Sequence, residues 1–360
     1  MKLIFDVHLD LSLNALEWNR DLTLPLAEIR SHESDMTDLK GRGQNTVCFE
    51  EMRRGGAGLC VATQIGGCMK PPGPVASWET PAQAWGMTQG QRAYYEALCD
   101  LGEMTPITNL EQLDSHLERW ADPVAVAEAK EPIGYILSLE GADSIVTIDY
   151  LERAWESGLR ALGPAHYGTG RYAFGHDRIG NLSELGKEFV RKMDELGLIL
   201  DVTHLSDGCF FDALEIFEGT VWASHSNCRA LVNDPRQFSN EQIRLLIERG
   251  AVLGAVFDAW MMVPNWVRGE STPQSTQLKV EAIIEHIDHI CQITGSAKHV
   301  GIGSDLDGGY GTEQCPSDLD SIEKLQMIVS LLEARGYERE DIEGIMHGNW
   351  IEFLNTHWSD

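Results

Sequence analysis

An apolar run near the start of the chain decides the fold: Leu3-Ile4-Phe5-Asp6-Val7-His8-Leu9-Asp10. Its length and composition are typical of a buried strand. Because side chains alternate across a strand, His8 and Asp10 share one face, while Leu9 faces the other way and packs against helices. No glycine-rich phosphate loop follows the run, which argues against a dinucleotide-binding sheet. The run therefore predicts a first strand that carries two polar side chains at its end.

Seven further runs of this kind alternate with helical patterns along the chain. Such alternation is typical of a parallel sheet and is compatible with either a barrel or an open doubly wound sheet. The expected strands are 3–8, 58–64, 133–140, 159–163, 198–204, 220–225, 252–257 and 299–305. Their number favours one (β/α)₈ TIM barrel, spanning residues 1–360 as a single catalytic domain.

The expected helices lie between these strands. Ser239-Asn240-Glu241-Gln242 reads as a capping box that opens a helix at 241–248. Apolar spacing predicts further helices at 185–196 and 280–294, and two closing helices at 321–334 and 341–353. The segment 66–130 is too long for a plain connection, so we expect an insertion there between the second and third strands, with helices near 89–101 and 110–121.

Charge and composition limit the partners and the location. Acidic residues outnumber basic ones by 56 to 28, giving a net charge of −28, which would repel nucleic acid and anionic membranes. There is no apolar run of about 18 residues and no signal-peptide core, so we expect a cytoplasmic protein without a membrane partner. The eight cysteines form no Cys-x-x-Cys pair, which predicts scattered reduced thiols.

Metal-binding residue types stand at the ends of most of the expected strands. In a barrel these ends meet at one face, where active sites lie. A single histidine there is more often a hydrogen-bonded rim residue, and a carboxylate could cap the next helix. The convergence of the whole set instead predicts a metal site: His8, Asp10, Glu140, His166, His204, His225 and Asp305.

Four short motifs make the chain similar to the membrane dipeptidase (renal dipeptidase) family of metallopeptidases, within the amidohydrolase-like barrels. They are Leu139-Glu140-Gly141, Asp201-Val202-Thr203-His204, Ser224-His225-Ser226-Asn227 and Gly301-Ile302-Gly303-Ser304-Asp305-Leu306-Asp307-Gly308. The resemblance runs from Asp6-Val7-His8-Leu9-Asp10 to Gly348-Asn349-Trp350, which is nearly the whole chain.

The resemblance implies a role for each site residue. His8 and Asp10 would bind one divalent metal ion, and His204 and His225 the second. Glu140 would bridge the two ions, for which zinc is expected. His166 would polarise the scissile carbonyl, Arg236 would hold the C-terminal carboxylate of the substrate, and Asp305 would transfer protons. For Arg236, an ordinary loop salt bridge is the alternative.

The chemistry implied is hydrolysis of the amide bond of a small dipeptide by a metal-bridged hydroxide, including dipeptides with a D-residue at the C-terminal side. Another small amide or an N-acyl amino acid could react at the same binuclear site, and a catalytically inactive binding barrel is a further alternative. The intact ligand set argues against inactivity. The resemblance is also compatible with a homodimer.

The chain departs from the family in two respects. It shows neither the signal sequence nor the hydrophobic anchor of the mammalian members, so a soluble bacterial-type member is expected. After the seventh strand it carries Phe257-Asp258-Ala259-Trp260-Met261-Met262 where the family often has a tyrosine-containing substrate loop. Trp260, Met261 and Met262 could form a pocket wall or simply core.

Several other residues attract attention. Asp307 is given a supporting role, and His176 is expected near the pocket. His286 and His289 share one helix face, where a surface pair is expected rather than a ligand pair.

Overall fold

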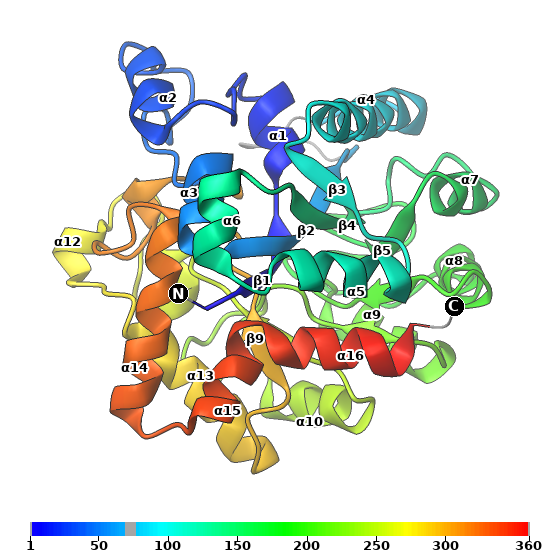
Figure 1. Cartoon of the computed structure of the whole chain (residues 1–360). Helices are drawn as coiled ribbons and strands as arrows, with labels where there is room; N and C mark the ends of the chain where they lie inside the picture. The colour runs from blue at the N-terminus through cyan, green and yellow to red at the C-terminus, as the bar shows by residue number, and fades with distance from the viewer. Residues whose placement is uncertain (1, 69–76, 359–360) are drawn as a thin grey trace.

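The computed structural model describes residues 2–68 and 77–358, and within them eight parallel strands form a nearly closed barrel (Figure 1). Along the sheet the order is β7-β6-β5-β4-β2-β1-β9-β8. The ring is completed between β7 and β8, where Ala223 pairs with Leu253 and the Gly254 N–H donates to the carbonyl of Ala223 at 2.8 Å. The strands are β1 (Ile4–Leu9), β2 (Ala57–Ile65), β4 (Ile133–Glu140), β5 (Leu159–Gly163), β6 (Ile199–Asp201), β7 (Val221–Trp222), β8 (Leu253–Ala255) and β9 (Val300–Ile302). The barrel expected from the sequence is confirmed.

The insertion after β2 is richer than the sequence analysis predicts. It contains α4 (Pro81–Asp100), β3 (Met104–Pro106), α5 (Leu110–Arg119) and α6 (Pro123–Ala129). The two expected helices are present as α4 and α5, whereas β3 and α6 were not predicted. The strand β3 pairs with the first residues of β4 but lies off the barrel path, and three residues ending in proline carry no recognisable period. Helix α4 begins earlier than predicted because Thr80 caps it and a proline follows.

Buried apolar side chains fill the barrel interior at its N-terminal end. Alternate residues of the strands, among them Phe5, Val7 and Ile136, point inward and form one buried apolar cluster with the side chains of α16 (Asn349–His357). Trp350 enters this end beside Gly301, where a Cβ atom would lie 2.2 Å from the indole nitrogen. That nitrogen donates a hydrogen bond to the Ile302 carbonyl at 3.1 Å. The interior is therefore a packed core below the site.

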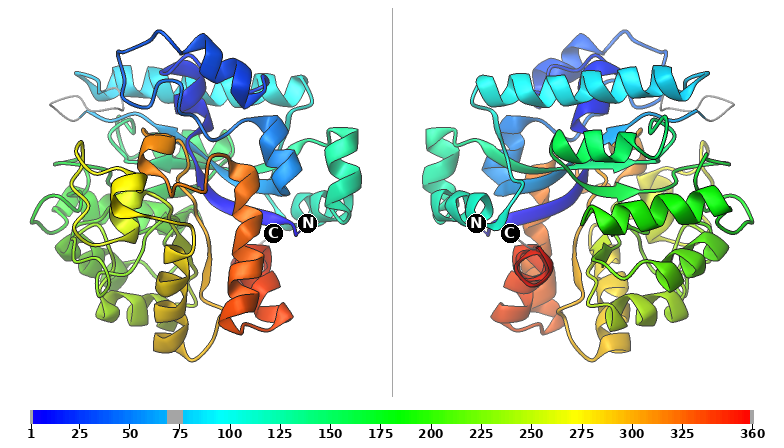
Figure 2. Two further views of the ribbon diagram at one scale, coloured as in Figure 1. Left: turned by 90° about the vertical axis from the view of Figure 1, so that its left-hand side faces the viewer. Right: turned by 90° about the vertical axis from the view of Figure 1, so that its right-hand side faces the viewer.

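Helices surround the barrel (Figure 2). The capping box at Ser239 and Gln242 is confirmed at the start of α10. The closing helices are more broken than predicted, because a 3₁₀ turn (Ile322–Gln326) precedes α14 and a π-helical turn (Gly344–Gly348) separates α15 from α16. The remaining helices are α1 (Leu11–Leu16), α2 (Leu26–His32), α3 (Phe49–Gly55), α7 (Tyr150–Glu156), α8 (Glu184–Glu195), α9 (Asp207–Ile216), α10 (Asn240–Glu248), α11 (Ala259–Met262), α12 (Pro273–Thr276), α13 (Ala282–Thr294), α14 (Met327–Arg335) and α15 (Arg339–Glu343).

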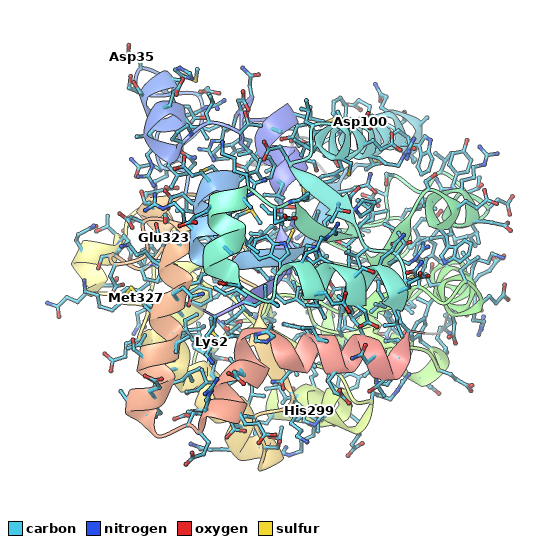
Figure 3. The ribbon with its side chains drawn as sticks, viewed as in Figure 1. Lys2, Asp35, Asp100, His299, Glu323 and Met327 are labelled. Carbon is cyan, nitrogen blue, oxygen red and sulfur yellow. The ribbon has the colours of Figure 1, made fainter. Side chains whose placement is uncertain are left out.

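Many of the acidic side chains lie on the outside, as Asp35 and Asp100 do in Figure 3. This distribution accounts for a high net charge without burying unpaired carboxylates throughout the core. Among the residues described, no helix has both the length and the apolar character needed to cross a bilayer.

Candidate metal centre and active site

The C-terminal ends of the strands bring the predicted site residues together. His8 and Glu140 lie within the ends of β1 and β4, and Asp10 follows β1 directly. The other members lie on the loops that follow β5, β6, β7 and β9: His166, His204, His225 and Asp305. No helix of the described residues begins directly after Glu140 or after Asp305, and Asp10, at the N-cap position of α1, makes no capping hydrogen bond with its side chain. The capping alternative therefore does not explain these carboxylates.

The backbone is left-handed at two of these positions. His204 has φ of 68° and Asp305 has φ of 58°, a region that non-glycine residues rarely occupy. Such conformations cost free energy of order 1–3 kcal/mol and tend to occur at functional sites. The short turns here aim both side chains back over the barrel mouth, so local strain accompanies the assembly of the site.

The first half of the site is built around His8. Its Nε2 lies 3.7 Å from an oxygen of Asp10, 3.8 Å from Oε2 of Glu140 and 3.7 Å from Oδ1 of Asp305. His8, Asp10 and Glu140 form one group whose ligand atoms could hold a cation. Leu9 belongs to the other apolar cluster, as expected, although Val7 and Phe5, two and four residues earlier, point inward. The irregularity in the pairing with β2 between Asp6 and Leu9 reverses the alternation there.

The second half is built around His204 and His225. Their Nε2 atoms lie 3.2 Å apart, and they lie 3.0 and 3.4 Å, respectively, from Oε1 of Glu140. These three residues form a second group able to hold a cation. Because Oε1 of Glu140 faces this half and Oε2 faces His8, the carboxylate has the geometry needed to bridge two ions. A third group joins His8, His225 and Asp305.

The unpartnered atoms at this face fit divalent cations. Among the residues described, the buried atoms without a hydrogen-bond partner include Nε2 of His8, Oδ1 of Asp10 and Oε1 of Glu140. A buried polar atom without a partner costs about 1–3 kcal/mol. Imidazole nitrogens and carboxylate oxygens together are the ligands that zinc prefers. The residues present therefore suit a two-metal centre.

Electrostatics lead to the same conclusion. Burial raises the pKa of Glu140 to about 8 and the pKa of Asp305 well above its usual range. Burial alone would lower the pKa of His8, but the carboxylates of Glu140 and Asp10 raise it to about 10. These buried carboxyl groups lack sufficient positive charge, which bound cations would supply.

Each proposed histidine ligand has a neutral partner on its other ring nitrogen. Nδ1 of His8 lies 3.5 Å from the Thr63 hydroxyl, and Nδ1 of His225 lies 2.8 Å from the Ser224 hydroxyl. Nδ1 of His204 lies 3.2 Å from Nδ1 of His176. Such partners fix the ring orientation and the tautomer of a metal-binding histidine. The sequence analysis expected His176 only near the pocket and missed this contact, which connects two different loops.

The glycine at position 175 makes that contact possible. A Cβ there would lie 2.2 Å from the carbonyl of His166, so only glycine lets the loop after β5 fold back on itself. Gly175 also pairs with Leu205 in an antiparallel bridge. The fold-back places His176 against His204, whose ring His166 also contacts.

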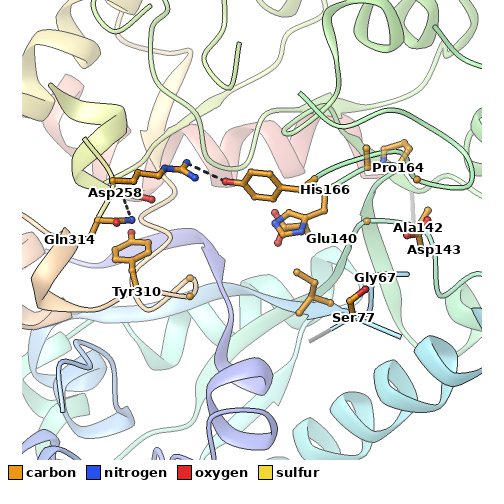
Figure 4. Close-up of a pocket in the computed structure, with 18 residues that line it drawn as sticks. Gly67, Ser77, Glu140, Ala142, Asp143, Pro164, His166, Asp258, Tyr310 and Gln314 are labelled. Carbon is orange, nitrogen blue, oxygen red and sulfur yellow. Dashed lines mark hydrogen bonds between the residues drawn. The ribbon is translucent and has the colours of Figure 1, made fainter. Parts of the chain in front are cut away.

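Two adjoining cavities lie over the ligand cluster. The larger, of about 270 Å³, is lined by Glu140, His166, Tyr167, Asp258 and Tyr310, among others (Figure 4). The smaller, of about 50 Å³, reaches the ligands themselves and shares Glu140, His166, Tyr167 and Asp258 with the larger. Burial lowers the pKa of His166 to about 4, so its imidazole is neutral at physiological pH. This site can hold a small substrate next to the ligand cluster.

Arg236 lies beneath the smaller cavity and is 3% exposed. One guanidinium nitrogen donates to the His225 carbonyl at 2.8 Å, and Nη1 has no hydrogen-bond partner among the described residues. No carboxylate of the described residues forms an ion pair with it. The loop salt bridge considered for Arg236 is therefore wrong.

The other residues singled out by sequence have structural partners. Asp307 accepts hydrogen bonds from the Thr46 and Val47 N–H groups, in agreement with a supporting role. His286 is buried and contacts backbone atoms of Cys228 and Met262, so the surface pair expected with His289 is wrong. Trp260 and Met261 line the smaller cavity, whereas Met262 is buried core.

A family model for the membrane dipeptidases (peptidase family M19) matches residues 2–357. The chain belongs to this family. Among curated relatives, it is 27% identical over 216 residues to an uncharacterised protein of Klebsiella pneumoniae, which covers 58% of this chain and 76% of the relative. It is 24% identical over 278 residues to the dipeptidase verJ of Clonostachys rogersoniana, covering 73% of this chain and 66% of that protein. For an uncharacterised dipeptidase of Schizosaccharomyces pombe, the matched share of the relative is about half, 53%.

Solved structures confirm the fold. The dipeptidase AC, a metallopeptidase of the same family, superposes with a TM-score of 0.76 at 22% identity, covering 100% of this chain and 99% of that one. A metallopeptidase from Rhodobacter sphaeroides, liganded with a phosphinate mimic of the dipeptide L-Ala-D-Ala, gives a TM-score of 0.75 at 21% identity, with 99% and 100% coverage. The chain thus has the barrel fold of these structures, in agreement with its family.

Proposed function

We propose that this chain hydrolyses the amide bond of small dipeptides at a binuclear metal centre, with zinc as the expected metal. The observation that carries the proposal is the convergence of unpartnered buried ligand atoms on Glu140, whose two oxygens face two separate groups. His8 and Asp10 would hold one cation, and His204 and His225 the other. When bound, the two cations would supply Lewis acidity for polarising the amide carbonyl and activating water.

Asp305 is the proposed proton-transfer residue. Its carboxylate is buried beside His8, at the floor of the smaller cavity. From there it accepts the proton of the attacking water and returns it to the leaving amine. A carboxyl group suits both steps when its surroundings disfavour a permanent charge, as burial does here.

His166 and Arg236 position the substrate. The neutral imidazole of His166 lines both cavities and offers an N–H group to the carbonyl oxygen as its negative charge grows. The free Nη1 of Arg236 lies in a buried position where a substrate carboxylate would satisfy it. Guanidinium groups bind carboxylates bidentately, which supports Arg236 as the anchor for the C-terminal carboxylate.

The larger cavity is of a size suited to a small substrate. L,D-dipeptides belong in the proposal because the Rhodobacter sphaeroides neighbour was liganded with a mimic of L-Ala-D-Ala. A cytoplasmic location, a homodimer and a single domain over residues 1–360 stay predictions, as does the absence of a nucleic-acid partner.

The test combines metal analysis with a substrate panel. Purified protein is expected to retain about two transition-metal ions per chain, and amine release is expected from L,L- or L,D-dipeptides. Chelation should abolish activity, and zinc should restore it. Less than one tightly bound ion, with no recovery on adding zinc, manganese or cobalt, would contradict the binuclear proposal. Metal binding without cleavage of any dipeptide, but with cleavage of an N-acyl amino acid, would replace the proposed substrate class.

A further inference from the structure

A second arginine borders the cavity on the opposite side of Tyr167 from the metal cluster. Arg268 lies on the loop after α11, where its guanidinium stacks over the Trp260 ring at 3.8 Å and donates to the Tyr167 hydroxyl at 3.3 Å. Arg268 lines the larger cavity, and Tyr167 and Asp258 line that cavity and the smaller one alike. Arg236 lines the smaller cavity. Two guanidinium groups therefore border two adjoining cavities that share Tyr167 and Asp258.

Neither the Arg236 nor the Arg268 guanidinium forms an ion pair with a carboxylate within the described ranges 2–68 and 77–358. Asp258 and Asp234 lie near enough to act on Arg268 electrostatically, but neither forms an ion pair with it, and both accept hydrogen bonds from other groups. Asp258 accepts hydrogen bonds from the Trp260 indole at 2.6 Å and from the Gln314 amide at 2.9 Å. Asp234 accepts from the backbone N–H of Arg236 at 2.8 Å. The chain has twice as many acidic as basic residues, yet Arg268 makes a cation–π contact with Trp260 and forms no ion pair with a carboxylate of the described residues.

The stacking gives Arg268 a defined position. The Trp260 ring covers one face of the guanidinium, and the Tyr167 hydroxyl takes one of its N–H groups. The remaining N–H groups have no acceptor among the described residues and can donate toward a ligand, and the planar group matches a carboxylate. Its outer side is exposed, so the bond to a ligand would be partly screened by solvent.

We propose that Arg268 and Arg236 together select dipeptides with an acidic C-terminal residue. This inference rests on the proposed function. The α-carboxylate of the substrate binds Arg236, and the side-chain carboxylate of a C-terminal glutamate or aspartate binds Arg268. A substrate with a single carboxylate would leave the second guanidinium without its charged partner. The expected preference over the uncharged amide is about 10- to 100-fold in kcat/KM, the effect of one charge-assisted hydrogen bond.

The decisive comparison uses isosteric substrates, Ala-Glu against Ala-Gln and Ala-Asp against Ala-Asn, each with an L- and a D-residue at the C-terminal position. Within the stereochemical series that the enzyme cleaves faster, the acidic member should have the higher kcat/KM by about 10-fold or more. Arg268→Gln should bring the ratio close to one. Arg268→Lys, which keeps the charge but not the planar fork, should give an intermediate ratio.

Arg171→Gln provides the matched control. Arg171 also stacks on a ring, that of Tyr172, and is exposed on the loop after β5, but it does not line the cavity. Its substitution removes the same charge and should leave the ratio unchanged. An equal fall in both variants would indicate diffuse attraction and overturn the assignment.

The outcomes separate the two proposals. If no dipeptide is cleaved by the metal-loaded enzyme, the proposed function fails. If Ala-Gln and Ala-Glu are cleaved with equal efficiency, the function stands and the selection by Arg268 is wrong. A high ratio that survives in Arg268→Gln would also overturn the role of this residue.

Discussion

Histidines are buried at both ends of the barrel, but the groups that surround them differ. At the N-terminal end, His116 on α5 has its Nε2 2.8 Å from the Gly58 carbonyl, between the starts of β2 and β4, and its Nδ1 has no hydrogen-bond partner among the described residues. At the C-terminal end, the Nε2 atoms of His8, His204 and His225 face carboxylates and one another. One end uses a polar ring to complete the packing, and the other leaves ligand atoms in need of a cation. The difference shows that neither burial nor one unpartnered nitrogen marks a functional histidine, whereas the grouping of several ligand atoms within reach of one cation does.

The largest effect is expected from Asp305→Asn at the C-terminal end. The amide cannot accept the water proton, so kcat should fall about 100- to 10,000-fold. Metal content should stay near that of the wild type, because each proposed ion keeps its other ligands. Steady-state kinetics and metal analysis on the same preparation check this. Wild-type turnover would remove Asp305 from the mechanism, and loss of metal would make it a ligand instead.

A substitution in the core at the N-terminal end of the barrel should lower stability without changing catalysis. Trp350→Ala removes the ring that fills the barrel beside Gly301, and should lower the free energy of unfolding by about 3–5 kcal/mol. Urea unfolding measures the loss. The folded fraction should retain its kcat, because the strand ends at the site are not touched. A large fall in kcat with unchanged stability would contradict the division between the two ends.

The titration of His116 should make that end sensitive to acid. Burial lowers its pKa to about 4, against an ordinary value of 6.5. Below pH 6.5 the unfolded chain binds a proton that the folded chain does not, so folding stability falls as the pH drops from 6.5 to about 4. The gap corresponds to about 3 kcal/mol.

His116→Gln tests this effect, because the amide nitrogen can take over the hydrogen bond to Gly58 without titrating. With metal removed by chelation, unfolding of the variant should depend less on pH over this range than unfolding of the wild type. Parallel pH curves for the two proteins would show that His116 does not contribute.

The smallest effect concerns the partner of a proposed ligand. His176→Leu keeps apolar packing but leaves Nδ1 of His204 without an acceptor, and should weaken zinc binding about 10- to 100-fold. His176→Asn should bind nearly as tightly, because its side-chain oxygen can occupy the place of Nδ1. Calorimetric zinc titration of the metal-free variants compares them, with apo-protein melting as the control for packing. Equal affinities for the two variants would assign His176 a packing role only.

Much of the barrel and of the candidate site could be predicted from sequence because both depend on short-range patterns. The alternation of apolar runs and helices predicted the eight barrel strands, and strand ends in a barrel meet at one face. The insertion was less predictable, since β3 has three residues and is a strand only through its pairing with β4. Likewise, the pairing of His286 with backbone atoms depends on neighbours far away in the chain.

The sequence by itself determined which residue types stand at the strand ends, and therefore the barrel and the set of candidate ligands. Only the tertiary structure decided how they face one another. Glu140 presents one oxygen to each half of the site, and His176 reaches His204 across a loop that Gly175 allows to fold back. Arg268 likewise meets Trp260 and Tyr167 across two loops. The reason is physical: periodicity along the chain fixes which face a side chain occupies, whereas distances between loops are set by packing and by backbone turns that no local pattern encodes.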